Sequence, residues 1–225
     1  MDVILIPGLW LDASSWDTVV PTLTAAGHRA HPITLPGADA GDIGIADWVA
    51  AVVAEIDRAE DPVVLVGHSG GGNVAWGAAD ARPDRVARVV FVDTVPPPPG
   101  AMISEFPVVD GRVPFPGWDA FDEPDIADID DETRRRIAAG AVDVPGRVPT
   151  DGVALTDDRR HGIPVTILSG QLDAQTLPGV LAEWGPFAEE FGRVADVEVV
   201  RLDSGHWPQF SQPESFARTL ASAVR

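Results

Sequence analysis

The feature that most constrains the fold of this 225-residue chain is a series of short, almost uninterrupted runs of Val, Ile and Leu. Each run ends in Gly, Pro, Ser or Asp, and such runs without polar alternation are typical of strands covered on both faces. The runs lie at 3–6, 29–35, 63–66, 86–92, 164–168 and 197–202. Helix-length segments separate or follow them at 16–26, 45–59, 73–81, 179–192 and 212–224. This alternation predicts an α/β fold, with a mainly parallel sheet of about six strands and helices on both faces.

Composition excludes several classes of function. The chain carries 35 acidic and 16 basic residues, a formal net charge of −19, which argues against nucleic-acid binding and against anionic membrane surfaces. It has no Cys and no Lys, so thiolate nucleophiles, disulfides and Schiff-base chemistry are excluded. The apolar run at 3–6 is too short for a signal peptide or a membrane span. We therefore expect a cytoplasmic protein.

One long segment interrupts the strand–helix rhythm. Residues 94–161 open with four prolines, contain no strong strand pattern and include one short helix candidate at 132–139. The segment leaves from the carboxyl end of the fourth run, where open parallel sheets bind their ligands. Long inserts of this kind are often functional lids. We expect a core made of residues 1–93 and 162–225, with a short lid or cap at 94–161.

The strongest chemical motif follows the third run. Gly67-His68-Ser69-Gly70-Gly71 joins a predicted strand to a predicted helix in the pattern Gly-x-Ser-x-Gly. Such a turn strains the serine backbone and exposes its hydroxyl, and it needs glycines because side chains there would collide with neighbouring elements. Ser69 is therefore the candidate nucleophile.

A serine hydroxyl needs a base, and in folds of this type the partners follow in the order Ser, acid, His. His28 and His31 precede the serine, His68 adjoins it, and His161 precedes a strand rather than following one. His206 comes after the last run, at the carboxyl end of the sheet. It alone satisfies both the order and the side of the sheet.

The acid that orients the histidine is less well determined by sequence. Asp173 lies just past the fifth run and between Ser69 and His206 in the chain, and we predict it as the acid. Asp93, which ends the fourth run, is the alternative.

A tetrahedral intermediate also needs two hydrogen-bond donors for its oxyanion. The N–H of Gly70, directly after the nucleophile, is one candidate. The loop after the first run, 7–10, offers the N–H of Leu9 as the first choice for the second donor and that of Trp10 as the next.

These motifs resemble the α/β-hydrolase superfamily over nearly the whole chain. The similarity rests on Pro7-Gly8-Leu9-Trp10, on the serine elbow at 66–71, on Val89–Asp93 followed by prolines, and on Gly205-His206. Among the branches, the chain most resembles the group that contains methylesterases and hydroxynitrile lyases. The resemblance implies an α/β-hydrolase fold with a serine nucleophile.

Two departures restrict the chemistry that the resemblance implies. Hydroxynitrile lyases of this branch carry Lys after the histidine, whereas this chain has Trp207, which disfavours cyanohydrin cleavage. Ser rather than Asp at position 69 disfavours epoxide hydrolase and haloalkane dehalogenase activities.

Aromatic and apolar side chains near the motifs are candidates for the substrate pocket. We predict the following pocket residues: Trp10, Met102, Phe115, Trp118, Phe121 and Trp207. The acidic run at 119–132 has no calcium-loop spacing and is interpreted as a solvated face, so no metal is expected.

The sequence thus predicts a serine hydrolase that needs no cofactor and cleaves an ester or related acyl bond of a small, largely apolar molecule. Two alternatives stay open at this point. The same residues could serve carbon–carbon bond hydrolysis or a lyase reaction in secondary metabolism, or the fold could be a non-catalytic ligand-binding module. The sequence gives no indication of the oligomeric state.

Overall fold

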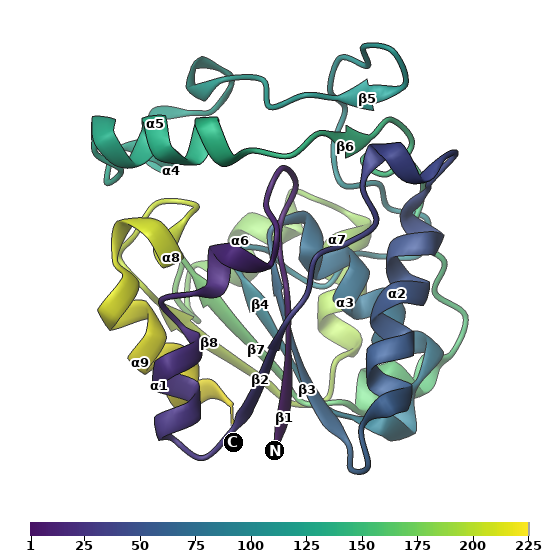
Figure 1. Cartoon of the computed structure of the whole chain (residues 1–225). Helices are drawn as coiled ribbons and strands as arrows, with labels where there is room; N and C mark the ends of the chain where they lie inside the picture. Colours follow the sequence, from purple (N-terminus) through teal and green to yellow (C-terminus); the bar gives the residue numbers. More distant parts are fainter. Residues whose placement is uncertain (225) are drawn as a thin grey trace.

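The central sheet has six strands in the order β2-β1-β3-β4-β7-β8, and every neighbouring pair is parallel. The computed structural model describes residues 1–224 (Figure 1). The strands are β1 (Asp2–Ile6), β2 (Arg29–Pro32), β3 (Val63–His68), β4 (Val86–Val92), β7 (Val165–Ser169) and β8 (Val197–Arg201). The predicted parallel sheet is confirmed, because the apolar runs leave no polar face that could meet solvent.

Helices cover both faces of the sheet, as expected. On one face, α1 (Val20–Ala25) and α9 (Pro213–Ala223) pack on alternate strand residues such as Val64 and Val66. On the other face, α2 (Ile45–Arg58) and α3 (Gly70–Ala81) pack on the intervening ones, among them Leu65 (Figure 1). The further helices of this part are α6 (Leu177–Ala182), α7 (Pro186–Arg193) and α8 (Pro208–Ser211). No helix within the described residues is both long and apolar enough to cross a membrane.

Two predicted helices are broken, and Pro and Gly explain where. The segment 16–26 forms only α1, preceded by a short 3₁₀ helix at Ala13–Trp16, because Pro21 fits best in the first turn of a helix. The segment 179–192 divides into α6 and α7 at Gly185, which has a φ of +52°. A positive φ cannot continue a right-handed helix, and the following proline begins the next one.

The inserted segment 94–161 has elements of its own above the carboxyl ends of the strands (Figure 1). It contains α4 (Glu123–Ile126), α5 (Asp131–Gly140) and an antiparallel pair of short strands, β5 (Arg112–Val113) and β6 (Val144–Pro145). The strand pair was not predicted, because two residues are too few for a recognisable pattern. The boundaries of the lid remain a prediction.

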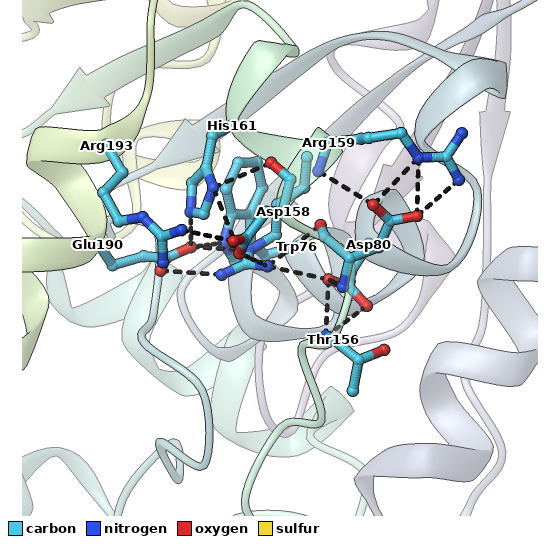
Figure 2. A network of polar contacts seen from close by, with 10 residues as sticks. Trp76, Asp80, Thr156, Asp158, Arg159, His161, Glu190 and Arg193 are labelled. Carbon is cyan, nitrogen blue, oxygen red and sulfur yellow. Dashed lines mark hydrogen bonds and ion pairs between the residues drawn. The ribbon is translucent and has the colours of Figure 1, made fainter.

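A buried ionic network lies where the chain returns from the insert to the core (Figure 2). Arg160 is 1% exposed and donates to both carboxylate oxygens of Glu190, at 2.8 and 3.0 Å, and to Asp80 at 3.1 Å. Glu190 also accepts from the Trp76 indole and contacts His161, both within 3.0 Å. Since Asp80 is on α3 and Glu190 on α7, the network joins the returning chain to two helices.

Removing one member of this network would leave the opposite charge buried and unpaired. We expect Arg160→Leu to lower the free energy of unfolding by about 3–5 kcal/mol. The matched control is Arg159→Ala, because Arg159 is mostly exposed and pairs at the surface with Asp157 and Asp84. That change is expected to have a much smaller effect on the free energy of unfolding, because solvent screens exposed ion pairs. Urea unfolding measures both, and equal effects would contradict a structural role for the network.

Candidate active site

Ser69 occupies the strained turn that the sequence motif predicts. It joins β3 to α3 with φ +52° and ψ −127°, a conformation that non-glycine residues rarely adopt. The turn is possible because its flanking glycines approach other backbone closely. A Cβ on Gly67 would lie 2.6 Å from the carbonyl oxygen of Gly71, and a Cβ on Gly71 would lie 2.5 Å from that of Pro7. Substitution of either glycine would therefore push the turn apart.

His206 is paired with a carboxylate from a different strand end. Its Nδ1 lies 2.6 Å from Oδ2 of Asp93, the residue directly after β4. The other carboxylate oxygen of Asp93 accepts from the N–H of Gly170, 2.7 Å away. Burial raises the pKa of Asp93, but the hydrogen bond and charge of His206 and the Gly170 N–H outweigh it, so the pKa lies below its ordinary value. Asp93 is therefore ionised at neutral pH.

The prediction of Asp173 as the acid partner of His206 is wrong in this geometry. The Asp173 carboxylate accepts from the backbone N–H groups of Gln175 and Thr176, each at 2.9 Å, and from the Thr176 hydroxyl. It thus closes the turn before α6 instead of reaching His206. The alternative, Asp93, occupies the position that the prediction gave to Asp173.

The loop that carries His206 is held by the insert. The backbone N–H of His206 donates to the carbonyl of Asp125, 2.8 Å away, and that of Gly205 donates to the Asp128 carboxylate, 2.9 Å away. A Cβ on Gly205 would clash with the Asp125 carbonyl oxygen, so a glycine is needed for this close approach. The insert therefore fixes the backbone of the loop, while Asp93 fixes the imidazole.

Ser69 and His206 face common space. Both line a cavity of about 540 Å³ and a smaller one of about 170 Å³. The Ser69 hydroxyl forms no hydrogen bond with another residue of the described chain, and such contacts often tighten only when substrate binds. The structure brings the two predicted residues to one site.

Backbone donors of the predicted oxyanion loop lie against the serine turn. A Cβ on Gly8 would be 3.2 Å from Cβ of Ser69, and one on Gly70 would be 3.3 Å from Cγ of Leu9. Within residues 1–224, the N–H groups of Leu9 and Gly70 have no hydrogen-bond acceptor. They can therefore donate to a group bound beside Ser69.

Trp10, whose N–H is the second choice for the oxyanion donor, also has a structural part through its side chain. Its φ is +62°, its side chain is buried, and its indole donates to the Val113 carbonyl at 3.1 Å. The ring lines the smaller cavity and makes edge contacts with Phe106 and Phe121, with centroids 4.8 and 5.9 Å apart. Trp10 thus joins the oxyanion loop to the insert.

The predicted pocket residues divide among three places. Met102 lines the larger cavity, while Trp10, Phe121 and Trp207 line the smaller one. Phe115 and Trp118 line neither, so the prediction that they wall the pocket is corrected. They support residues that line the smaller cavity: the Phe115 ring packs on Trp10 and the Trp118 ring packs on Trp207, with centroids 5.7 and 5.3 Å apart.

Several lining residues have no signal in the sequence. Ile103, Leu172 and Phe187 are ordinary apolar residues of a loop, a turn and a helix, and only the fold brings them to the cavities. Asn73 is four residues after Ser69 on the predicted helix. That one-turn spacing puts it on the same helix face, so it could have been found.

His68, which precedes Ser69 in the chain, contacts the backbone of the loop that carries His206. Its Nε2 lies 2.8 Å from the backbone carbonyl of His206, which can only accept, so Nε2 carries the proton. Its Nδ1 then accepts from the side-chain amide of Gln209 at 3.3 Å. Burial and the neighbouring His206 lower the pKa of His68 to about 3, so the ring is neutral.

The depressed pKa of His68 makes stability depend on pH. Unfolding exposes a histidine of pKa about 6.5, so the unfolded chain takes up a proton as pH falls below that value while the fold does not. This stabilising contribution is complete above pH 6.5 and is lost towards pH 3. Between pH 7 and 5, it decreases by about 2 kcal/mol.

We expect His68→Gln, whose amide can still donate to the His206 carbonyl, to lack this dependence. Urea unfolding of both proteins at pH 7 and pH 5 measures it. The free energy of unfolding of the wild type should fall by about 2 kcal/mol more than that of the variant between pH 7 and pH 5. Equal losses would show that His68 is charged in the fold.

Comparisons with known proteins identify the family of the chain. A model of the Alpha/beta hydrolase family matches residues 3–219. A pyrethroid hydrolase of Sphingobium wenxiniae is 28% identical, with 98% of this chain and 86% of that protein covered. A pimeloyl-[acyl-carrier protein] methyl ester esterase of Aromatoleum aromaticum is also 28% identical, with 100% and 98% covered.

Solved structures of other hydrolases are similar over the whole chain. The crystal structure of a pyrethroid hydrolase from Sphingobium faniae aligns with a TM-score of 0.73 at 26% identity, covering 100% of this chain and 97% of that one. An extracellular alpha/beta-hydrolase from a Paenibacillus species aligns with a TM-score of 0.80 at 20% identity, covering 100% and 99%, which shows the shared fold.

Proposed function

The chain belongs to the alpha/beta hydrolase family and is a carboxylic ester hydrolase, and we propose that it works through a triad of Ser69, His206 and Asp93. The observation that carries this proposal is the 2.6 Å contact between His206 and Asp93 beside a strained, half-buried Ser69 that lines the same cavities. The substrate is a small molecule with a largely apolar body, in keeping with the apolar side chains that line part of each cavity, such as Leu172 and Phe187 in the larger and Phe106 in the smaller.

The first half of the reaction transfers the acyl group to the enzyme. Nε2 of His206 takes the hydroxyl proton of Ser69 while Oγ forms a bond with the ester carbon. The ionised Asp93 accepts the proton on Nδ1, holds the ring orientation and stabilises the imidazolium. The bond between the ester carbon and the alkoxy oxygen then breaks, and His206 returns the proton to the leaving alcohol.

The second half removes the acyl group. His206 takes a proton from water, whose oxygen bonds to the acyl carbon, and the ester bond to Ser69 breaks as the proton returns to Oγ. The N–H groups of Gly70 and Leu9, which have no other acceptor among the described residues, donate to the oxyanion in both halves. Residues 94–161 act as the cap that closes over the acyl-enzyme.

The central test of this proposal removes the nucleophile or the base. Ser69→Ala and His206→Ala should each lower kcat for a chromogenic ester by about 10⁴ to 10⁶ without changing the unfolding midpoint. Ser215→Ala, an exposed serine on α9, serves as the control and should behave like the wild type. Hydrolysis by Ser69→Ala at the wild-type rate would refute the assignment.

Two further readouts separate the alternatives. A serine-directed phosphonate should label Ser69, which is identified by mass spectrometry of the labelled peptide. Absence of labelling would favour a ligand-binding module. Product analysis on a β-diketone beside an aryl ester distinguishes ester cleavage from carbon–carbon bond cleavage.

The choice between the two acids has a direct test. We expect Asp93→Asn to lower kcat by about 10⁴, because the amide disfavours the required histidine tautomer and cannot stabilise the imidazolium. Asp173→Asn should stay within a few-fold of the wild type, since this carboxylate only closes its own turn. Measuring kcat of both variants on one ester decides the assignment, and the reverse order would restore Asp173.

A further inference from the structure

The two cavities beside the nucleophile meet at one side chain of the insert. Of the residues that line them, three line both: Ser69, His206 and Ile103. The first two are the proposed nucleophile and base, which any ester must reach. Ile103 therefore stands between the spaces that the two halves of an ester would fill.

Ile103 is in close contact with the serine turn. A Cβ on Gly70 would lie 3.0 Å from both Cδ1 and Cγ2 of Ile103. The isoleucine thus packs over the residue that follows the nucleophile, and its branched side chain has little freedom to turn aside.

The backbone that carries Ile103 is anchored. The N–H groups of Ile103 and Ser104 both donate to the Pro149 carbonyl, at 2.8 and 3.1 Å, and the N–H of Val153 donates to the Ala101 carbonyl at 3.0 Å. Its neighbours take opposite sides: Met102 lines only the larger cavity and Ser104 only the smaller one. Residues 102–104 thus form a partition with Ile103 at its edge.

The cavities differ in size. About 540 Å³ is enough for a sizeable organic group, while 170 Å³ is below the usual range of ligand pockets. Leu9, Ile103 and four Trp or Phe rings line the smaller cavity beside Ser69, His206, His68 and Ser104, and the indole N–H of Trp10 is already bonded to Val113. It therefore suits only a small group, whose apolar part can pack on these rings.

The larger cavity contains an amide that nothing in the described chain satisfies. Asn73 is 7% exposed and lines this cavity, and its side chain forms no hydrogen bond with any of residues 1–224. A substrate that displaces water from this cavity would leave the amide without a partner, which is unfavourable, unless it carries a group that pairs with Asn73. Asn73 follows Ser69 by one helical turn, close to where an ester would react.

We propose that Ile103 is a specificity-determining residue that divides the site, so that the enzyme selects esters of two unlike halves. One half is small and apolar, and the other is larger and carries a hydrogen-bonding group that pairs with Asn73. This inference rests on the proposed ester hydrolysis at Ser69. It extends that proposal by stating which shapes of ester the enzyme accepts and which two residues, Ile103 and Asn73, determine this choice.

The size arm uses three esters: methyl 2-naphthoate, 2-naphthyl acetate and 2-naphthyl benzoate. The first two have one large half, on opposite sides of the ester, and the third is large on both sides. We expect Ile103→Ala to raise kcat/KM for the third by at least about 10-fold relative to the better of the first two, because the cavities become continuous. Ile103→Val, which removes one methyl group, should have a smaller effect in the same direction.

Met102→Ala is the matched control, because it widens the larger cavity without joining it to the other. It should give no selective gain on 2-naphthyl benzoate. The proposal is overturned if neither Ile103 variant gives that gain or if Met102→Ala gives it equally. If no ester is cleaved faster by the wild type than by Ser69→Ala, the proposed function itself fails instead.

The polarity arm tests Asn73 on the better one-sided ester. The naphthalene ring is substituted in turn at each free position with a hydroxyl or with a methyl group of similar size. The wild type should have a lower KM for at least one hydroxyl isomer than for its methyl counterpart. Asn73→Leu should abolish that difference in KM while still cleaving the methyl series. No hydroxyl preference at any position, or a preference that survives Asn73→Leu, would overturn the role of Asn73.

Discussion

The close packing of backbone around Ser69 is the constraint on which the rest of the site depends. A serine at φ +52° is held there only because Gly67 and Gly71 let three backbone segments meet without side chains between them. That contact ties β1, β3 and α3 into one rigid unit. The loop after β1, Ser69 and the helix that carries Asn73 consequently have fixed positions relative to one another, before any substrate arrives.

His206, the proposed base, is held in a different manner from Ser69, the proposed nucleophile. Ser69 depends on steric contact of backbone, whereas the His206 imidazole depends on hydrogen bonds from separate parts of the chain. Asp93 fixes one ring nitrogen, and the N–H of Gly170 fixes Asp93. Neutral His68 donates to the backbone carbonyl of His206. Because His68 remains uncharged, it adds no positive charge beside a ring that must itself accept a proton.

The sequence predicted the sheet, Ser69 and His206, because each is set by local pattern: apolar runs, a Gly-x-Ser-x-Gly turn, and order along the chain. It misassigned the acid, because two strand ends offer an aspartate and only the three-dimensional structure shows that the Asp173 carboxylate is engaged with its own turn. The place of Ile103 between the two cavities could not be predicted at all, since an isoleucine in an irregular segment has no periodic or motif signal.

The insert also holds the loop that carries His206, as the close approach of Gly205 to Asp125 shows. Because Asp125 and Asp128 accept the backbone N–H groups of the histidine loop, the insert cannot be exchanged for that of a relative as an independent module. A transplanted segment would have to bring both acceptors to the same two amides. Diversification of substrate range in this scaffold is therefore easier through single side chains on the existing insert than through replacement of the whole segment.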